Sequence, residues 1–409
     1  LEAVGERENV PVMVMGKITD TGRMVVKDSK TGETAVDLDL ELVLGELPKK
    51  TFVDHHVPAV LKPLVLPEQL TVMQALDRVL RLLSVGSKRF LTSKVDRWMM
   101  GLIARQQCCG PLHLPLSDVA VFAQSPFSTT GCATAIGEQP VKGLIDPAAM
   151  GRLTVGEACT NLVWAAITDI EDVKCSGNWM WASKLEGEGA AMYDCCEAMG
   201  AAMLELGVAV DGGKDSLWMA TKVGEEVVSV YAGCPDISLT VTPDIKHAGR
   251  SSLVFVDLSG GHARLGGSAL AQTFKQLGDV TPDCDTALLK RAFLATQRLL
   301  RERVLLAGHD RSDGGLLTTV LEMCFGGDCG CVMEATTENS VMEFLFNEEL
   351  GLVVQIPARV IAKTQAANRV KVSVNGAVVL DEDVKALHDL WEATSFELDK
   401  LQWKKEGCL

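Results

Sequence analysis

A short polar cluster between two apolar segments has the composition of a site for a cation and a phosphate. It runs His309-Asp310-Arg311-Ser312-Asp313 and is followed by Gly314 and Gly315. Carboxylates are ligands for a hard cation, and the glycines let the backbone approach a phosphate closely at the start of a helix. The same residues also suit an ordinary helix cap with turn glycines. The cluster alone leaves both interpretations open.

Further oxygen donors lie on two elements that precede this cluster. Asp118 begins the predicted buried strand 118–123, where a carboxylate is costly unless it has a partner. Glu157 and Asn161 lie four residues apart on the predicted helix 152–168, hence on one helix face. Mg²⁺ accepts such oxygens alongside those of a phosphate. From spacing alone, a metal site and a solvent-facing Glu–Asn hydrogen bond are equally favoured.

A glycine-rich cluster, Asp211-Gly212-Gly213-Lys214-Asp215-Ser216, follows a short apolar strand at residues 208–210. Its flexible amides, ammonium group and hydroxyl are typical of a phosphate-binding turn. It is not a Walker A loop, because Gly213 stands where that motif has its lysine. A solvated turn is the alternative, but the density of Gly, Lys, Asp and Ser favours a function. Another polar cluster, around Asp169, ends the helix 152–168.

Length and charge limit the classes of protein. The chain has 409 residues, 47% of them hydrophobic, which is enough for two or three domains with cores of their own. A net charge of −15 argues against nucleic acid and anionic membranes as partners. There is no apolar run of membrane-spanning length and no targeting leader, so we expect a cytoplasmic chain. Because it does not begin with Met, we expect a piece of something longer.

The 13 cysteines are scattered and odd in number, which favours a reducing compartment. Cys324, Cys329 and Cys331 form one cluster, but they lack Cys-x-x-Cys spacing and a nearby pair of histidines. Packed, reduced thiols are therefore favoured over a zinc site.

The elements that must position these residues fall into four segments. We predict two strands at 11–18 and 23–28, and a similar strand, turn, strand and helix recurs at 370–391, roughly 350 residues later. The recurrence predicts the tail of one domain copy followed by a complete second copy. We therefore expect a tail at 1–45, a proline-rich linker at 46–70, and domains at 71–246 and 247–400. Within them, helices are predicted at 71–83, 286–306 and 316–323, and strands at 252–258 and 352–356.

Five motifs occur in one order and carry a resemblance to a known family. They are Ala133-Thr134-Ala135-Ile136-Gly137-Glu138-Gln139-Pro140, Val173-Lys174-Cys175-Ser176-Gly177-Asn178-Trp179-Met180, Gly212-Gly213-Lys214-Asp215-Ser216, Gly308-His309-Asp310-Arg311-Ser312-Asp313-Gly314-Gly315 and Phe346-Asn347-Glu348-Glu349-Leu350-Gly351. With them, essentially the whole chain resembles the large, single-chain, animal-like phosphoribosylformylglycinamidine synthase family of purine biosynthesis.

The resemblance implies a fold and an activity. Members of that family are ligases that use ATP and glutamine-derived ammonia to convert formylglycinamide ribonucleotide to formylglycinamidine ribonucleotide. The implied fold is α/β (α+β): an aminoimidazole-ribonucleotide-synthetase-like half, with an N-type sheet domain and a C-type α/β domain. The chain then corresponds to the tail of the first half plus the whole second half. The N-terminal domain, most of the first half and the glutaminase are missing, so we expect no activity from this segment alone.

The resemblance also implies a site. An auxiliary nucleotide site of the family holds ADP with Mg²⁺, and its metal ligands correspond to Asp118, Glu157, Asn161 and Asp310. The residues expected next to the nucleotide are Ser117, Gly213 and Ser312. Asp169, Lys214, Asp215 and Ser216 correspond more loosely to one wall of the catalytic pocket. The alternative is a non-catalytic structural nucleotide-binding module. One departure is that the stretch between Glu226 and Cys234 is several residues shorter than the family pattern, where a strand is usual.

Overall fold

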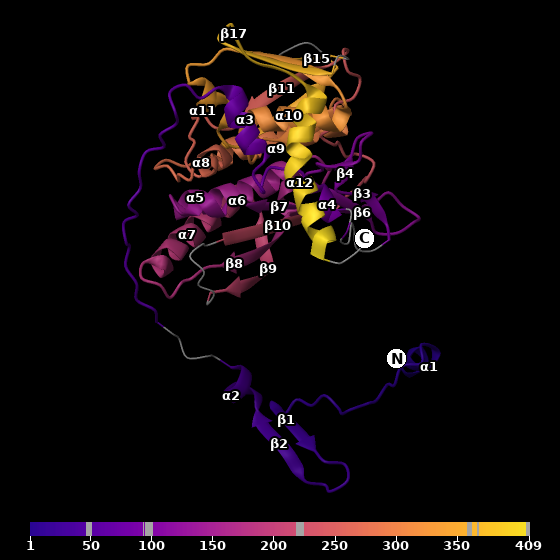
Figure 1. Cartoon of the computed structure of the whole chain (residues 1–409). Helices are drawn as coiled ribbons and strands as arrows, with labels where there is room; N and C mark the ends of the chain where they lie inside the picture. The colour runs from indigo at the N-terminus through magenta and orange to yellow at the C-terminus, as the bar shows by residue number, and fades with distance from the viewer. Residues whose placement is uncertain are drawn as a thin grey trace. The chain divides into compact units, whose positions relative to one another are not determined.

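A computed structural model gives two compact units, Leu1–Val53 and Asp54–Leu409 (Figure 1). The structure describes residues 1–45, 51–92, 94, 101–217, 225–357, 362–365 and 368–405. The boundary at Asp54 falls inside the segment predicted as a linker, and residues 51–67 contain neither helix nor strand. The predicted division at 246/247 lies within the second unit and stays a prediction.

The first unit is a small hairpin between two short helices. Helix α1 (Glu2–Arg7) is followed by strands β1 (Arg23–Lys27) and β2 (Thr34–Asp39), which pair antiparallel, and by α2 (Leu40–Leu44). The predicted strand at 11–18 is wrong, because those residues form no regular structure and their apolar side chains are exposed. A strand needs a neighbour for its backbone hydrogen bonds, and in the described part of this unit β1 and β2 pair only with each other.

A hairpin followed by a helix does occur in both units, but in the first unit its strands are β1 and β2, not the predicted pair 11–18 and 23–28. In the second unit, β16 (Arg369–Val374) pairs antiparallel with β17 (Ala377–Asp383), and α12 (Val384–Lys405) follows directly. The turn residues Asn375 and Gly376 both have positive φ, the conformation that a tight hairpin turn with this twist requires.

A six-stranded sheet forms one half of the second unit. Its strand order is β3 (Ile103–Arg105), β6 (Ala120–Ala123), β7 (Gly131–Glu138), β10 (Glu225–Cys234), β8 (Lys174–Met180) and β9 (Ala209–Ser216). All neighbours are antiparallel except β8 and β9, which are joined by the crossover helix α7 (Glu188–Leu206). The stretch predicted to be shorter than the family pattern contains strand β10, which pairs with both β7 and β8. Residues 218–224, just before it, lie outside the described residues.

The buried helix α6 (Pro147–Leu162) packs against this sheet and against α7. Eleven of its 16 residues are buried, so it is apolar on nearly every side. It begins earlier than predicted because Asp146 caps it and Pro147 suits the first helical position. One hydrophobic core combines α6, helix α9 (Thr286–Arg301) and strands of both large sheets.

The cap of α7 comes from far along the chain. Gly187 at its start has no side chain, and the carboxylate of Asp54 accepts hydrogen bonds from the amides of Gly187, Gly189 and Ala190 at 2.9–3.2 Å. The last part of the connecting segment is thereby fixed to the second unit.

A seven-stranded sheet forms the other half, drawn at the top of Figure 1. Its order is β12 (Ala307–Asp310), β14 (Gly351–Ile356), β11 (Ser252–Asp257), β15 (Ala362–Gln365), β13 (Gly330–Ala335), β16 and β17. Helices α3 (Val72–Leu80), α10 (Gly315–Gly327) and α12 share its main core. The shorter elements are α4 (Arg89–Thr92), β4 (Cys108–Cys109), β5 (Leu114–Pro115), α5 (Pro140–Gly143), η1 (Ile170–Asp172), α8 (Ala269–Thr273) and α11 (Val341–Phe346). The predicted α/β (α+β) fold class is confirmed.

Candidate nucleotide and metal site

A cavity of about 700 Å³ brings together residues from the two sheets. Five of the predicted ligand and nucleotide residues line it: Ser117, Asp118, Asn161, Asp310 and Ser312. Asp118 lies just before β6 of the six-stranded sheet, whereas Asp310 is the last residue of β12 in the seven-stranded sheet. The cavity is therefore built from segments that lie far apart in the sequence.

The centre of the cavity is a buried cluster of two carboxylates and an imidazole. Ligand atoms of Asp118, His309 and Asp310 all lie within 4.8 Å of one another. The side chains of both aspartates are at most 5% exposed, yet Oδ2 of each has no hydrogen-bond partner, and neither does the buried Oγ of Ser117. Buried polar atoms are normally paired, so unpaired oxygens on residues that line one cavity suit a cation that prefers oxygen ligands.

His309 supplies the positive charge of this cluster. Its Nδ1 lies 2.8 Å from Oδ1 of Asp118, and its Nε2 lies 3.0 Å from Oε2 of Glu322 on α10. Burial alone would lower the pKa of His309, but the carboxylates of Asp118 and Glu322 raise it well above its ordinary value of 6.5. The raised pKa favours the protonated imidazole, whose positive charge would offset part of the negative charge.

The carboxylates of this region outnumber its positively charged groups, and their raised pKa values reflect the free-energy cost of burying negative charge. Burial raises the pKa of Asp118 despite its contact with His309. Burial and the charge of Asp118 raise the pKa of Asp310 to about 8. Burial and the charge of Asp310 raise the pKa of Glu157 well above its ordinary value. A divalent cation would relieve all three, so the residues present fit a bound Mg²⁺.

Glu157 and Asn161 are held against the end of β7. The amide of Glu138 donates to Oε2 of Glu157 at 2.7 Å, and Nδ2 of Asn161 donates to the carbonyl of Ile136 at 2.9 Å. A hydrogen bond between the two side chains, the alternative that spacing left open, is not among the bonds of these described residues. Asn161 lines the cavity and Glu157 interacts with the charge of Asp310, although Glu157 lies outside the tight cluster.

The rest of the cavity has features of a nucleotide pocket. Lys88 and Arg105 contribute positive charge to its lining, and Ile103, Phe122 and Ile136 contribute apolar surface from the six-stranded sheet. The ammonium of Lys88 donates to the carbonyls of Ser84 and Gly86, which holds it at the cavity edge. Positively charged side chains bind phosphate oxygens, and an apolar surface can contact a nucleotide base.

Four residues that line the cavity are not among those predicted from the sequence: Lys88, Arg105, His309 and Glu322. His309 stood in the opening polar cluster, next to a predicted ligand, and could have been found there. Glu322 lies 13 positions further along an apolar helix, and its carboxylate meets His309 only because α10 packs beside β12. No local pattern marks Lys88 or Arg105.

The predicted catalytic-pocket residues have a different setting. Gly213, Lys214, Asp215 and Ser216 lie within β9, so the predicted turn after residue 210 is wrong. They extend the parallel pairing with β8, in which Lys214 is opposite Asn178. Asp169 caps η1 at the start of β8.

The register therefore separates these pocket residues. Asp169 lies near one end of the β8–β9 pair and Lys214 toward the other, so they do not meet in the described sheet. Of the predicted nucleotide residues, Gly213 is also absent from the lining of the 700 Å³ cavity. The role of Asp169, Lys214, Asp215 and Ser216 in a catalytic pocket stays a prediction.

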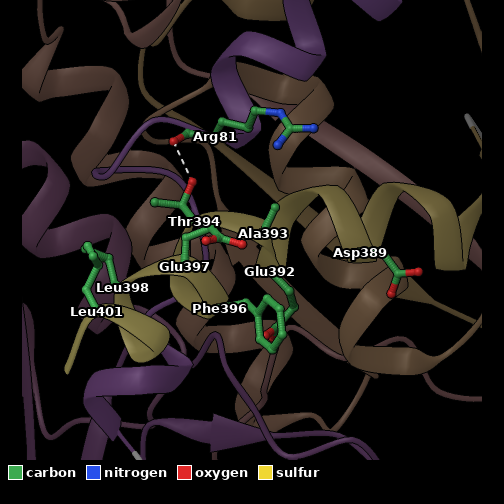
Figure 2. A pocket seen from close by; sticks show the side chains of 9 residues that line it. All are labelled: Arg81, Asp389, Glu392, Ala393, Thr394, Phe396, Glu397, Leu398 and Leu401. Carbon is green, nitrogen blue, oxygen red and sulfur yellow. Dashed lines mark hydrogen bonds between the residues drawn. The ribbon is translucent and has the colours of Figure 1, made fainter. Parts of the chain in front are cut away.

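A second hollow of about 610 Å³ lies along α12 beside Arg81, and Figure 2 shows its lining side chains. Thr394 donates to the carbonyl of Arg81 there at 2.9 Å. The other lining residues are Asp389, Glu392, Ala393, Phe396, Glu397, Leu398 and Leu401. None of these described side chains contributes a buried, unpaired polar atom, in contrast to the first cavity.

The clustered cysteines belong to the hydrophobic core. Cys324, Cys329 and Cys331 are buried and free, and burial raises the pKa of Cys329 to about 12. Among the described helices, none has the length and apolar character to cross a membrane.

Comparisons with known proteins identify the domains and the fold of this chain. Residues 87–243 match the FGAR-AT PurM_N-like domain, and residues 255–389 match the C-terminal domain of AIR synthase related proteins. The fold resembles Thermotoga maritima PurL complexed with FGAR, with a TM-score of 0.60 at 14% identity, over 78% of this chain and 54% of that one.

Relatives of higher identity are named phosphoribosylformylglycinamidine synthase. The Homo sapiens protein is 52% identical over 448 aligned positions, which cover 98% of this chain and 34% of the human protein. The Dictyostelium discoideum protein is 45% identical, over 98% of this chain and 34% of its own length. Since 448 positions exceed the 409 residues here, the human protein has residues without a counterpart in this chain.

The chain thus spans about a third of the length of the curated relatives it matches, and both matched domain types are consistent with the name that these relatives share. The chain belongs to the phosphoribosylformylglycinamidine synthase family.

Proposed function

We propose that this chain is part of a purine-biosynthetic ligase and carries an auxiliary ADP–Mg²⁺ site. The observation that supports the site most directly is the pair of unpaired, buried carboxylate oxygens of Asp118 and Asp310, which come together from two sheets. Ser117 and Ser312 line the same cavity, where they would contact the nucleotide. The charge and polarity of the lining suit a diphosphate with a hard cation.

In this proposal the metal ligands are Asp118, Glu157, Asn161 and Asp310. Bound Mg²⁺ would neutralise charge on the diphosphate and on the carboxylates. Lys88 would add an ammonium group beside the phosphates. His309 keeps Asp118 oriented through Nδ1 and is itself held by Glu322, so the two carboxylates stay gathered at one point.

The parent reaction would be ATP-dependent amidation of formylglycinamide ribonucleotide with ammonia derived from glutamine. Phosphoryl activation of an amide oxygen precedes attack by ammonia in such chemistry, and catalysis rests on positioning and charge stabilisation. Asp169, Gly213, Lys214, Asp215 and Ser216 are proposed to face the catalytic pocket from the β8–β9 edge. Nucleotide and ribonucleotide substrates, glutamine-derived ammonia and the remaining domains of the enzyme are the proposed partners, in the cytoplasm, with neither nucleic acid nor a membrane.

A second candidate is a structural nucleotide-binding module whose ADP only stabilises the fold. The depth of the site supports it, because its ligands join two sheets and their burial is costly without a cation. Both roles are compatible within one enzyme, in which this half supports an active pocket built mostly elsewhere.

The test is calorimetric titration of the purified chain with ADP in the presence of Mg²⁺ and again in EDTA. We expect Mg²⁺-dependent binding, and no formylglycinamidine ribonucleotide from the chain supplied with ATP, ammonia and formylglycinamide ribonucleotide. Absence of ADP binding would refute the site, and turnover by the chain alone would refute the auxiliary role.

A further inference from the structure

Outside the ligand cluster, a deeply buried ion pair joins Lys142 and Glu348. Nζ of Lys142 lies 2.5 Å from Oε2 of Glu348, and their side chains are only 3% and 1% exposed. Lys142 belongs to α5, directly after β7 of the six-stranded sheet. Glu348 lies between α11 and β14, next to the seven-stranded sheet. The pair therefore links the two halves of the second unit.

The second oxygen of Glu348 fixes the start of a helix. Oε1 accepts hydrogen bonds from the amide of Gly314, at the start of α10, and from the amide of Ala269, at the start of α8, both at 2.8 Å. Gly314 has a positive φ and no side chain of its own to cap α10. Glu348 thus replaces a local cap and at the same time binds Lys142.

Each partner lies next to a segment that holds proposed ligands. On one side, β7 holds Glu157 and Asn161 through the backbone of Glu138 and Ile136, a few residues before Lys142. On the other side, Gly314 closely follows the segment that contains Asp310 and Ser312. The Lys142 ammonium also lies 3.6 Å from Oδ1 of Asp313 in that segment.

The pair is not explained by stability alone. Buried charges lose their hydration, and a pair of neutral side chains of similar size is often no less stable. A charged pair that spans two sheets does define one separation and orientation between them. Mg²⁺ demands near-ideal octahedral geometry, so the ligands on the two sides must be held at fixed spacing.

We propose that Lys142 and Glu348 are positioning residues that set the distance between the two groups of metal ligands. Glu157 and Asn161 form one group, and Asp310 with its neighbours forms the other. The inference rests on the proposed ADP–Mg²⁺ site and adds to it a brace that touches neither metal nor nucleotide. Loss of the brace would let the two groups drift apart while each stays folded.

The experiment compares the double variant Lys142→Met/Glu348→Gln with the unmodified chain. The Glu348→Gln change keeps a side-chain oxygen for the Gly314 amide, and the Lys142→Met change fills the space of the lysine stem. The melting temperature without ligand should therefore change little. We expect ADP binding in Mg²⁺ to weaken about tenfold or more, a range typical when groups that support metal ligands are removed. Any residual binding of ADP in EDTA should be equally weak in the variant and in the unmodified chain.

The preference for Mg²⁺ over Ca²⁺ distinguishes a change in the positions of the metal ligands from a general loss of structure. Ca²⁺ accepts longer and more irregular ligand distances than Mg²⁺. ADP affinity in Ca²⁺ should therefore fall less than affinity in Mg²⁺, so the ratio of the two affinities changes. The single variant Glu348→Gln leaves the buried Lys142 ammonium with only Asp313, at 3.6 Å, as a charged partner among the described residues. We expect it to change the affinity ratio in the same direction, with a larger loss of stability than the double variant.

A matched control is Arg264→Met/Glu349→Gln. Arg264 and Glu349 form a close pair at 2.6 Å in the same segment, but their bonds to each other involve neither Gly314 nor α5. We expect its Mg²⁺-to-Ca²⁺ ratio to match that of the unmodified chain. If the unmodified chain binds ADP with Mg²⁺ and the folded Lys142/Glu348 variants keep its affinity and metal ratio, the brace is refuted. If the unmodified chain itself shows no Mg²⁺-dependent binding, the proposed site fails as well.

Discussion

His309 and Asp118 contact each other from different sheets, with Nδ1 of the imidazole 2.8 Å from Oδ1 of the carboxylate. The contact involves Oδ1 of Asp118 and leaves Oδ2 of Asp118 without a hydrogen-bond partner. Oδ2 of the neighbouring Asp310 also has no hydrogen-bond partner. The imidazole thus lies in close contact with the buried acidic cluster and leaves free the oxygens that a cation would bind. The predictions below follow from this arrangement.

Replacing Asp310 by Asn should separate ligand binding from stability. Asn has nearly the same shape as Asp310 and, like the protonated carboxyl that a pKa of about 8 favours at neutral pH, carries no charge, so the melting temperature of the ligand-free chain should be preserved. The increase in melting temperature on adding ADP–Mg²⁺ should be lost, because a metal ligand is gone. Differential scanning calorimetry measures both. Asp313→Asn is the control, and an equal loss of the ligand effect in that variant would contradict the assignment.

Replacing His309 by Gln should destabilise the ligand-free chain. The change leaves Asp118 and Glu322 without their shared positive charge, and breaking a buried pair in this way costs about 3 kcal/mol. Urea unfolding followed by circular dichroism gives the free energy. Adding Glu322→Gln in the same chain should recover part of the loss, and additive losses in the double variant would show that the two groups act separately.

Stability without metal should fall as pH rises. The pKa of Asp310 is about 8 in the folded chain against an ordinary 3.8, so between these values the folded state binds more protons than the unfolded state. That stabilisation is complete below pH 3.8 and is lost as pH rises through 8. His309 acts in the same direction, because its pKa is also raised in the folded chain. Urea unfolding in EDTA at a series of pH values measures the trend, and stability that rises with pH across this range would contradict it.

Bound metal should reverse this trend. Mg²⁺ needs the deprotonated carboxylates, so the melting-temperature increase caused by ADP–Mg²⁺ should be larger at about pH 8.5 than at about pH 6, with protons released on binding. Titration calorimetry in buffers of different ionisation enthalpy counts the released protons. A ligand effect that shrinks as pH rises would be the opposite result.

Gly308→Ala should disturb the strand that carries His309 and Asp310. A Cβ at position 308 would lie 2.1 Å from the ring of Trp164, a fully buried side chain just beyond α6. Overpacking of this kind costs about 1–3 kcal/mol. Gly212→Ala is the control, since nothing lies within 4 Å of a Cβ there. Urea unfolding should show a loss for position 308 and almost none for position 212, whereas equal losses would place the strain elsewhere.

Local sequence patterns predicted the long, regular elements because their signals are local. Helix α9 repeats apolar residues with helical period and begins at a cap, Asp285, so its start is predicted at the correct residue. The prediction of a strand at 11–18 was wrong because an apolar run does not specify a pairing partner. The prediction of a turn at 211–216 was wrong because glycines, although typical of turns, are tolerated in an edge strand whose hydrogen bonds are made with β8.

The site was predictable only where residues of one motif, or a family resemblance, marked it. Asp310 and Ser312 lie in one conspicuous cluster, and the resemblance added Asp118, Glu157 and Asn161. Glu348 lies in one of the motifs of the resemblance, but nothing in the sequence paired it with Lys142, because the two residues lie 206 positions apart and meet only when both sheets are packed.

The carboxylate of Asp54 has a practical consequence for expressing the second unit by itself. A truncation that starts after this position would leave the 19-residue helix from Glu188 with three amides exposed at its start. Loss of a helix cap costs about 1 kcal/mol, and the first turn would fray. Shortened versions meant for crystallisation should therefore retain the chain from Asp54 onward.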